Sequence, residues 1–193
     1  MGSLERMPEP SNPVTGEADE SSFTLLVLDR DGTVIEHVPY LCEPNDVRLL
    51  PTAARTIAAA NALSVPVVVV TNQSGVARGM FSLGDVERVN ERMLALLRSA
   101  GAHINAIYVC PHAYGDGCGC RKPQPGLLLR ALNEHGSTAS EMLVVGDNAS
   151  DGYAADAAGA RFVGVLTGVQ REKDADGTQW RWEESLEQAV FHR

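Results

Sequence analysis

One stretch decides the fold: Leu25-Leu26-Val27-Leu28-Asp29-Arg30-Asp31-Gly32-Thr33. Its four apolar residues predict a strand that is buried on both faces, and two acids stand where that strand ends. Because side chains alternate along an extended chain, Asp29 and Asp31 point to the same side. Like charges at a buried strand end are unfavourable unless a cation or a shared proton relieves them. Alone, the pattern also fits a solvated turn, so the rest of the chain must decide.

Strands and helices alternate after this first strand. Apolar runs predict strands at 23–28, 65–70, 104–109, 142–145 and 161–165. Helical patterns fall at 52–63, from Ser82 through Leu97, from Pro125 to Gly136 and at 151–158, and Leu186 and Val190 share a last helical face. This alternation predicts an α/β fold, Rossmann-like and three-layered, with a mostly parallel sheet. In such sheets, ligands bind at the carboxyl ends of the strands, near the switch in strand order.

Length and composition are typical of one globular domain. The 193 residues suffice for a sizeable core, and 44% of them are hydrophobic. Residues 1–22 are rich in acids, prolines and serines, so we expect a disordered acidic leader before a single domain at 23–193. The net charge of −9 disfavours nucleic acid or an anionic membrane as a partner. Because neither a signal peptide nor a membrane-spanning run is evident, we expect a cytoplasmic protein.

Reactive groups accompany other predicted elements. Thr71-Asn72-Gln73-Ser74-Gly75 follows the second strand, Arg121-Lys122-Pro123 precedes a helix, and Gly146-Asp147-Asn148-Ala149-Ser150-Asp151 follows the fourth strand. Each has an ordinary alternative: a turn after a strand, a solvated lysine, a helix N-cap and, for Asp151, an acid that stabilises the helix dipole. Their order along the chain and their place at strand ends favour a single active site instead.

A second group of reactive residues is Cys110-Pro111-His112 followed by Cys118-Gly119-Cys120. Three thiols and one imidazole complete a tetrahedral Zn²⁺ site with no open position for catalysis. The alternatives are a surface loop with incidental thiols and a disulfide, and a reducing cytosol favours the metal. The loop leads directly into Arg121 and Lys122, so we predict that zinc fixes these two cations. Cys42 is interpreted as a spare thiol.

The order Asp, Thr, Lys and Gly-Asp-x-x-x-Asp resembles the haloacid-dehalogenase (HAD) superfamily of aspartate-nucleophile phosphatases. The resemblance extends over 23–168 and implies the HAD fold. It implies that Asp29 attacks phosphorus and forms an aspartyl-phosphate. Asp31 then protonates the leaving oxygen and afterwards activates water. The Thr71 hydroxyl and the Lys122 ammonium hold the phosphoryl oxygens.

The same resemblance implies a Mg²⁺ site. Its ligands are the Asp29 carboxylate, the Asp31 backbone carbonyl and Asp147, with Asp151 as an outer acid that holds metal-bound water. Hard carboxylate and carbonyl oxygens are the ligands that Mg²⁺ prefers.

The details of the motifs resemble one family within this superfamily. Asp-Arg-Asp-Gly-Thr, the segment 71–79 and the zinc loop are together similar to the D-glycero-D-manno-heptose 1,7-bisphosphate 7-phosphatases. The related histidinol-phosphate phosphatases share the Asp pair and the zinc loop, but typically carry Asp-Gly after Thr-Asn-Gln. Two departures are Asn148, where the heptose enzymes often have Lys, and the short segment between His112 and Cys118. The resemblance predicts these substrate contacts: His37, Tyr40, Asn72, Gln73, Ser74, Arg78 and Arg121.

The spacing of the motifs leaves no room for a large cap domain. The interval 29–71 fits one helix and one strand, and 71–122 fits a helix, a strand and the zinc loop. An open site disfavours a phosphomutase, which usually excludes water. We therefore predict a monomeric, Mg²⁺-dependent sugar phosphatase that carries a structural Zn²⁺. Histidinol-phosphate phosphatase is the enzymatic alternative. A zinc-stapled interaction module is the other alternative, and the complete set of reactive residues argues against it.

Overall fold

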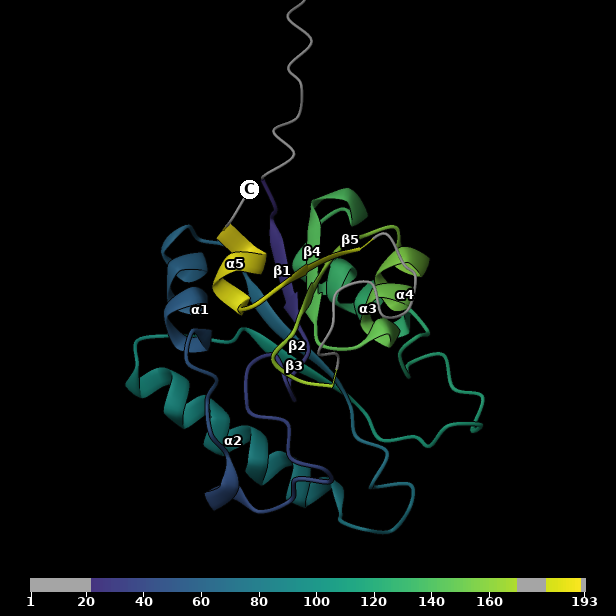
Figure 1. Ribbon diagram of the computed structural model, residues 1–193. Helices are drawn as coiled ribbons and strands as arrows, with labels where there is room; N and C mark the ends of the chain where they lie inside the picture. The colour runs from purple at the N-terminus through teal and green to yellow at the C-terminus, as the bar shows by residue number, and fades with distance from the viewer. Residues whose placement is uncertain (1–21, 170–179, 192–193) are drawn as a thin grey trace, which may run out of the picture.

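The computed structural model describes residues 22–169 and 180–191 (Figure 1). All but one residue of the predicted leader, and the end of the chain from 192, lie outside them. The described residues form one six-stranded parallel sheet with the order β3-β2-β1-β4-β5-β6. Its strands are β1 (Leu25–Leu28), β2 (Val67–Asn72), β3 (Ala106–Cys110), β4 (Met142–Gly146), β5 (Arg161–Val165) and β6 (Arg181–Glu183). The helices are η1 (Pro44–Asp46), α1 (Ala53–Ala62), α2 (Leu83–Ser99), α3 (Gly126–His135), η2 (Ala139–Glu141), α4 (Ala149–Ala158) and α5 (Leu186–Phe191).

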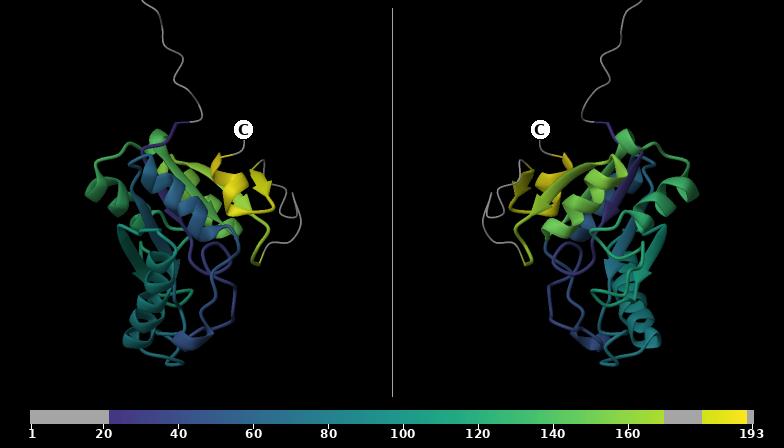
Figure 2. Two further views of the ribbon diagram at one scale, coloured as in Figure 1. Left: turned by 90° about the vertical axis from the view of Figure 1, so that its left-hand side faces the viewer. Right: turned by 90° about the vertical axis from the view of Figure 1, so that its right-hand side faces the viewer.

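Helices cover both faces of the sheet (Figures 1 and 2). Alternation along β1 sends Leu26 and Leu28 into a core shared with α1, α2 and α5. It sends Leu25 and Val27 into a second core shared with α3 and α4. All four side chains are at most 1% exposed, as expected of a strand buried on both faces. The predicted three-layer α/β fold is confirmed, and the described part of the sheet is parallel throughout.

The strand order reverses beside β1. From β1 the chain builds outward through β2 and β3, then returns to place β4 on the opposite side of β1. The Asp29 N–H donates to the Val145 carbonyl at 2.9 Å, so the two strands stay paired to the carboxyl end of β1. A crevice opens at this edge because the flanking connections leave in opposite directions. Asp29 and Asp147 stand at its two sides.

Two strands differ from the predictions, and the short helices η1 and η2 were not predicted. Strand β2 was expected to end at Val70 but extends to Asn72, because Thr71 and Asn72 pair with Val109 and Cys110 of β3. Thr71 therefore stands in a rigid strand rather than in a turn. Strand β6 was not predicted: it has only three residues, and it depends on pairing with β5.

The connections near the crevice are short elements and loops. In the described residues, η1 and α1 join β1 to β2, α2 joins β2 to β3, and a loop joins β3 to α3. These connections agree with the predicted fold without a large cap domain. Among the helices of the described residues, none has the length and apolar character needed to cross a membrane.

Candidate active site

A cavity of about 390 Å³ lies at the carboxyl ends of the strands. Its walls bring together the five residues predicted to carry the chemistry: Asp29, Asp31, Thr71, Lys122 and Asp147. They also include most of the predicted substrate contacts and the outer acid: His37, Tyr40, Asn72, Gln73, Ser74, Arg121 and Asp151. Residues from four separate segments of the chain therefore converge on one site, as the sheet topology requires.

The Lys122 ammonium lies buried at the base of the cavity. Nζ lies 2.6 Å from Asp29 Oδ1 and 2.6 Å from Asp151 Oδ1, and it donates to the Val70 carbonyl at 2.7 Å. Burial alone would lower the pKa of Lys122, but the charges of Asp151 and Asp29 outweigh it and leave that pKa above its ordinary value. The side chain is therefore a permanent cation within reach of the predicted nucleophile.

Asp147 is buried, with an exposed fraction of 3%. The Val169 N–H donates to its Oδ2 at 2.6 Å. Burial, together with the charge of Asp29, raises the pKa of Asp147 to about 8. Two glycines make room for it: a methyl group built on Gly32 or Gly168 would approach Asp147 Oδ2 within 2.4 or 1.9 Å. Gly32 also has a φ of +80°, which an L side chain rarely adopts.

Three carboxylates form a compact set with the chemistry of a hard-cation site. One oxygen each of Asp29, Asp147 and Asp151 lies within 4.8 Å of the others. Burial raises the pKa of Asp151 as well, against the opposing charge of Lys122. Bringing such groups together is unfavourable unless protons or a cation balance them. Asp151 also accepts from the Asn148 N–H at the start of α4, so the predicted outer acid contacts both Lys122 and the helix end.

Asp31 is held by two neighbours. Gln73 Nε2 donates to Asp31 Oδ2 and to Thr71 Oγ1, each at 2.9 Å, so Gln73 joins the predicted acid to the predicted phosphoryl ligand. The guanidinium of Arg30 forms a fork on the same carboxylate, with Nε donating at 3.1 Å and Nη2 at 3.3 Å. Arg30 was not predicted as a site residue, although a charged residue so soon after a buried strand is itself a signal of pairing.

The amide of Asn72 clamps the Lys122 peptide. Its Nδ2 donates to the Lys122 carbonyl and its Oδ1 accepts from the Lys122 N–H, both at 3.1 Å. This pair of hydrogen bonds ties the end of β2 to the loop that carries the lysine. Asn72 was predicted to contact substrate, and the structure gives it this positioning contact as well.

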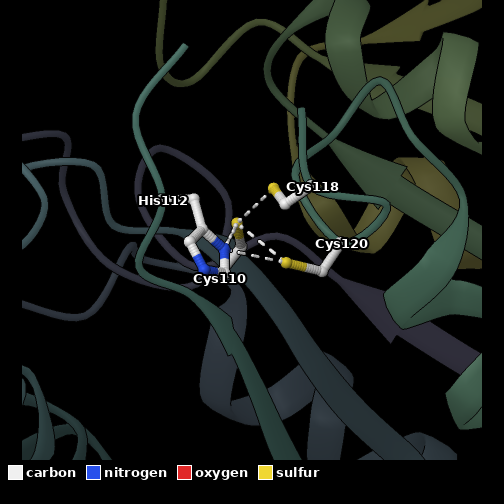
Figure 3. A group of neighbouring side chains, drawn as sticks. All are labelled: Cys110, His112, Cys118 and Cys120. Carbon is white, nitrogen blue, oxygen red and sulfur yellow. Dashed lines mark hydrogen bonds between the residues drawn. The ribbon is translucent and has the colours of Figure 1, made fainter. Parts of the chain in front are cut away.

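Cys110, His112, Cys118 and Cys120 converge at the end of β3 and in the loop that follows it (Figure 3). The distances between their ligand atoms are 3.3 Å for Cys110–Cys120, 3.8 Å for Cys110–Cys118 and 3.2 Å for His112 Nδ1–Cys120. Tetrahedral bonds of about 2.0–2.3 Å to one metal would separate such atoms by roughly 3.5–3.8 Å. Arg121 Nη1 donates to the His112 carbonyl at 3.2 Å, which links the loop to the cavity.

Arg78 lies at the rim rather than in the wall of the cavity. Its Nη1 donates to the Tyr40 hydroxyl at 2.7 Å, and its guanidinium lies 5.9 Å from the centre of the Tyr40 ring. Tyr40 is half exposed. The predicted contact of Arg78 with substrate therefore remains a prediction, supported by its place beside a residue of the cavity wall.

Comparison with known proteins defines the class. The HAD-hydrolase-like family model matches residues 119–187. D-glycero-beta-D-manno-heptose-1,7-bisphosphate 7-phosphatase of Neisseria meningitidis is 36% identical over 155 residues, covering 75% of this chain and 78% of the relative. The Pseudomonas putida protein of the same name is 40% identical over 146 residues, covering 75% and 83%.

A solved structure supports the same classification. D,D-heptose 1,7-bisphosphate phosphatase from B. bronchiseptica, complexed with magnesium and phosphate, has a TM-score of 0.81 and 33% identity, covering 87% of this chain and 96% of that one. The chain is a HAD-type phosphatase. More narrowly, it belongs to the D-glycero-beta-D-manno-heptose-1,7-bisphosphate 7-phosphatase family. The predicted resemblance, fold and enzyme class are confirmed.

The packing around Asp147 gives a first test. Gly168→Ala would place a methyl group against the Asp147 carboxylate, so we expect kcat to fall at least about tenfold and half-saturation by Mg²⁺ to need more metal. Gly84→Ala in α2 is the matched control, because the nearest atoms to its new methyl group are 3.6 Å away. Equal Mg²⁺ dependence in the two variants would show that Asp147 has no part in metal binding.

Proposed function

We propose that this protein hydrolyses the 7-phosphate of D-glycero-β-D-manno-heptose 1,7-bisphosphate, with Mg²⁺, through an aspartyl-phosphate on Asp29. The observation that carries the proposal is the buried ion pair of Lys122 and Asp29, flanked by Asp147 at the strand-order switch. A phosphoryl group in transit spreads its charge over its oxygens, so catalysis needs positioned cations and a positioned nucleophile. The names of the relatives support the choice of sugar.

Asp29 acts as the nucleophile in the first step. A carboxylate oxygen of Asp29 bonds to phosphorus while the ester P–O bond breaks and its electron pair stays on the leaving oxygen. Asp31 gives that oxygen its proton. Lys122 and the Thr71 hydroxyl balance the charge on the phosphoryl oxygens. Their burial favours this role, because fixed donors act more strongly where water is excluded.

Asp31 acts again in the second step. Now ionised, it takes a proton from water as the water oxygen attacks the phosphorus of the aspartyl-phosphate. Phosphate leaves, and Asp29 is restored as a carboxylate. One residue can serve both steps only if its carboxyl group stays at a fixed place beside the phosphorus. The hydrogen bonds from Arg30 and Gln73 supply that fixation.

The carboxylates of Asp29, Asp147 and Asp151 have the chemistry of a Mg²⁺ site. Asp29 and Asp147 offer carboxylates, and the backbone carbonyl of Asp31 is the third proposed ligand. Burial, and then the charge of Asp29, raises the pKa of Asp147, and a bound cation would offset both effects. When bound, Mg²⁺ supplies positive charge to the phosphoryl oxygens and to Asp29. Asp151 would hold the outer part of this site, and its ion pair with Lys122 supports the position of that side chain.

The side chains of Cys110, His112, Cys118 and Cys120 have the chemistry of a structural Zn²⁺ site. It offers four soft or borderline ligands, and the cluster is closed, so no position is left for a substrate. Cys110 is fully buried, and burial raises its thiol pKa to about 12. A bound metal would instead hold this sulfur as a thiolate. Because the loop leads into Arg121 and Lys122, zinc would fix both cations.

Arg121 is proposed to bind the phosphate that is not hydrolysed. The net charge of −9 repels a bisphosphate at long range, so local cations must carry recognition. Lys122 is committed to Asp29 and Asp151, and Arg121 is the remaining cation in the cavity wall within the described residues. A guanidinium can bind phosphate through two parallel hydrogen bonds.

Asp29→Asn tests the mechanism. We expect turnover to fall on the order of 10³-fold or more with the fold retained, because the amide cannot attack phosphorus. Phosphate release and circular dichroism measure the two effects. Asp46→Asn, on the exposed surface of η1, is the matched control and should keep wild-type activity. An unchanged kcat in Asp29→Asn would refute the aspartyl-phosphate.

Cys118→Ser tests the zinc site. We expect the wild type to contain about one zinc per chain by elemental analysis, and the variant to lose it. Activity should fall about 10–100-fold, because Arg121 and Lys122 lose their support. Cys42→Ser should retain both zinc and activity. Freshly purified wild type that is free of zinc and fully active would disprove the structural role.

Arg121→Ala tests the substrate. We expect KM for the heptose 1,7-bisphosphate to rise about 10–100-fold, and KM for the heptose 7-phosphate to change far less, because only the bisphosphate loses a contact. Arg98→Ala, on the exposed end of α2, is the control. Equal losses on both substrates would place Arg121 at the reacting phosphate. A wild-type preference for histidinol phosphate would assign the chain to the alternative activity.

A further inference from the structure

Arg30 is a charged side chain buried inside the fold, with an exposed fraction of 1%. It stands between the two acids that end β1, and its guanidinium turns back onto the second of them. Nε donates to Asp31 Oδ2 at 3.1 Å, Nη2 lies 3.0 Å from the same oxygen, and Nη2 donates to Oδ1 at 3.3 Å. A buried guanidinium is tolerated only when its charge and donors are matched in this way.

The third nitrogen of the guanidinium, Nη1, binds a residue of helix α2. Nη1 of Arg30 donates at 2.8 Å to Oδ1 of Asn90, which is buried in the middle of α2. Asn90 faces the core beside Val89 and Met93, where an apolar residue would satisfy packing alone. The amide oxygen therefore has a specific partner, and the guanidinium is fixed at both ends.

This anchoring distinguishes the two oxygens of Asp31. Oδ2 accepts from Arg30 and, at 2.9 Å, from Gln73 Nε2. Among the described residues, Oδ1 accepts the longer 3.3 Å hydrogen bond from Arg30 Nη2 and no other. Since Oδ2 is occupied by donors, Oδ1 is the oxygen that can carry a proton and exchange it with the substrate.

We infer that Arg30, anchored by Asn90 of α2, is a positioning residue that fixes the Asp31 carboxyl group so that Oδ1 faces the leaving oxygen. The inference rests on the proposed general-acid role of Asp31. The pair acts through Asp31 and does not touch substrate. Helix α2, through Asn90 and Arg30, thereby sets the orientation of the acid proposed to act in both steps.

The test uses two substrates that differ chiefly in how strongly the leaving oxygen needs a proton from a general acid. Phenyl phosphate and p-nitrophenyl phosphate have similar shape and charge, but the phenolate leaving group is more basic and depends more on a general acid. Asn90→Ala should lower kcat/KM about tenfold for phenyl phosphate and less than about twofold for p-nitrophenyl phosphate. Asn90→Asp keeps the acceptor oxygen and should restore most of the loss. Arg30→Lys keeps the charge but lacks the fork, and should show the same selective loss as Asn90→Ala.

Two controls separate the possible failures. Leu97→Ala opens a cavity in the same helix about two turns from Asn90, and should lower thermal stability without selectivity between the two substrates. Asp31→Asn should show the largest selective loss, about 100-fold on phenyl phosphate. If Asp31→Asn is unselective, the proposed role of Asp31 is wrong. If Asp31→Asn is selective while Asn90→Ala and Arg30→Lys are not, the positioning role of Arg30 alone is overturned.

Discussion

The contact between Lys122 and the carboxylates of Asp29 and Asp151 is the constraint on which the site depends. It joins the end of β1, the first turn of α4 and the loop before α3, three segments far apart in the sequence. An ammonium so deeply buried is tolerable only because two carboxylates and the Val70 carbonyl surround it. Removing either acid would leave Lys122 with a single carboxylate partner, and removing both would leave a buried charge uncompensated. The residues that stabilise the buried lysine are therefore the same residues that form the site.

The loop that leads to Lys122 is not part of a helix or strand, and two sets of side-chain contacts hold it in place. The side-chain amide of Asn72 bonds both polar groups of the Lys122 peptide. On the other side, three cysteines and His112 gather within reach of one metal ion, and Arg121 donates to the His112 carbonyl. The lysine is therefore fixed by the end of a strand and by a closed ligand cluster, which gives a loop residue the precision usually found in regular structure.

The sequence predicted the strands and the reactive residues for a clear reason. A continuous apolar run followed by polar groups identifies a parallel strand and the edge of the sheet where ligands bind, which places Asp29 and Asp147 together. It could not predict that Thr71 lies within β2, because that depends on pairing with Val109 across the sheet. Strand β6 was missed for the same reason. The clamp by Asn72 joins residues fifty positions apart, and the contact of Arg30 with Asn90 joins residues sixty apart. Neither leaves a local pattern.

Charge balance explains why such a site should need a metal ion. Four carboxylates belong to the cavity in the described residues, Asp29, Asp31, Asp147 and Asp151, and its cations are Lys122, Arg121 and the supporting Arg30. With all four acids ionised against three cations, this set carries a net negative charge and would repel a phosphoryl group that carries about two negative charges. A divalent cation reverses the sign. The acids proposed to supply the nucleophile and the proton therefore disfavour an anionic substrate unless a cation joins them. Burial, and then the charge of Asp29, raises the pKa of Asp147, and both effects favour a cation at this carboxylate.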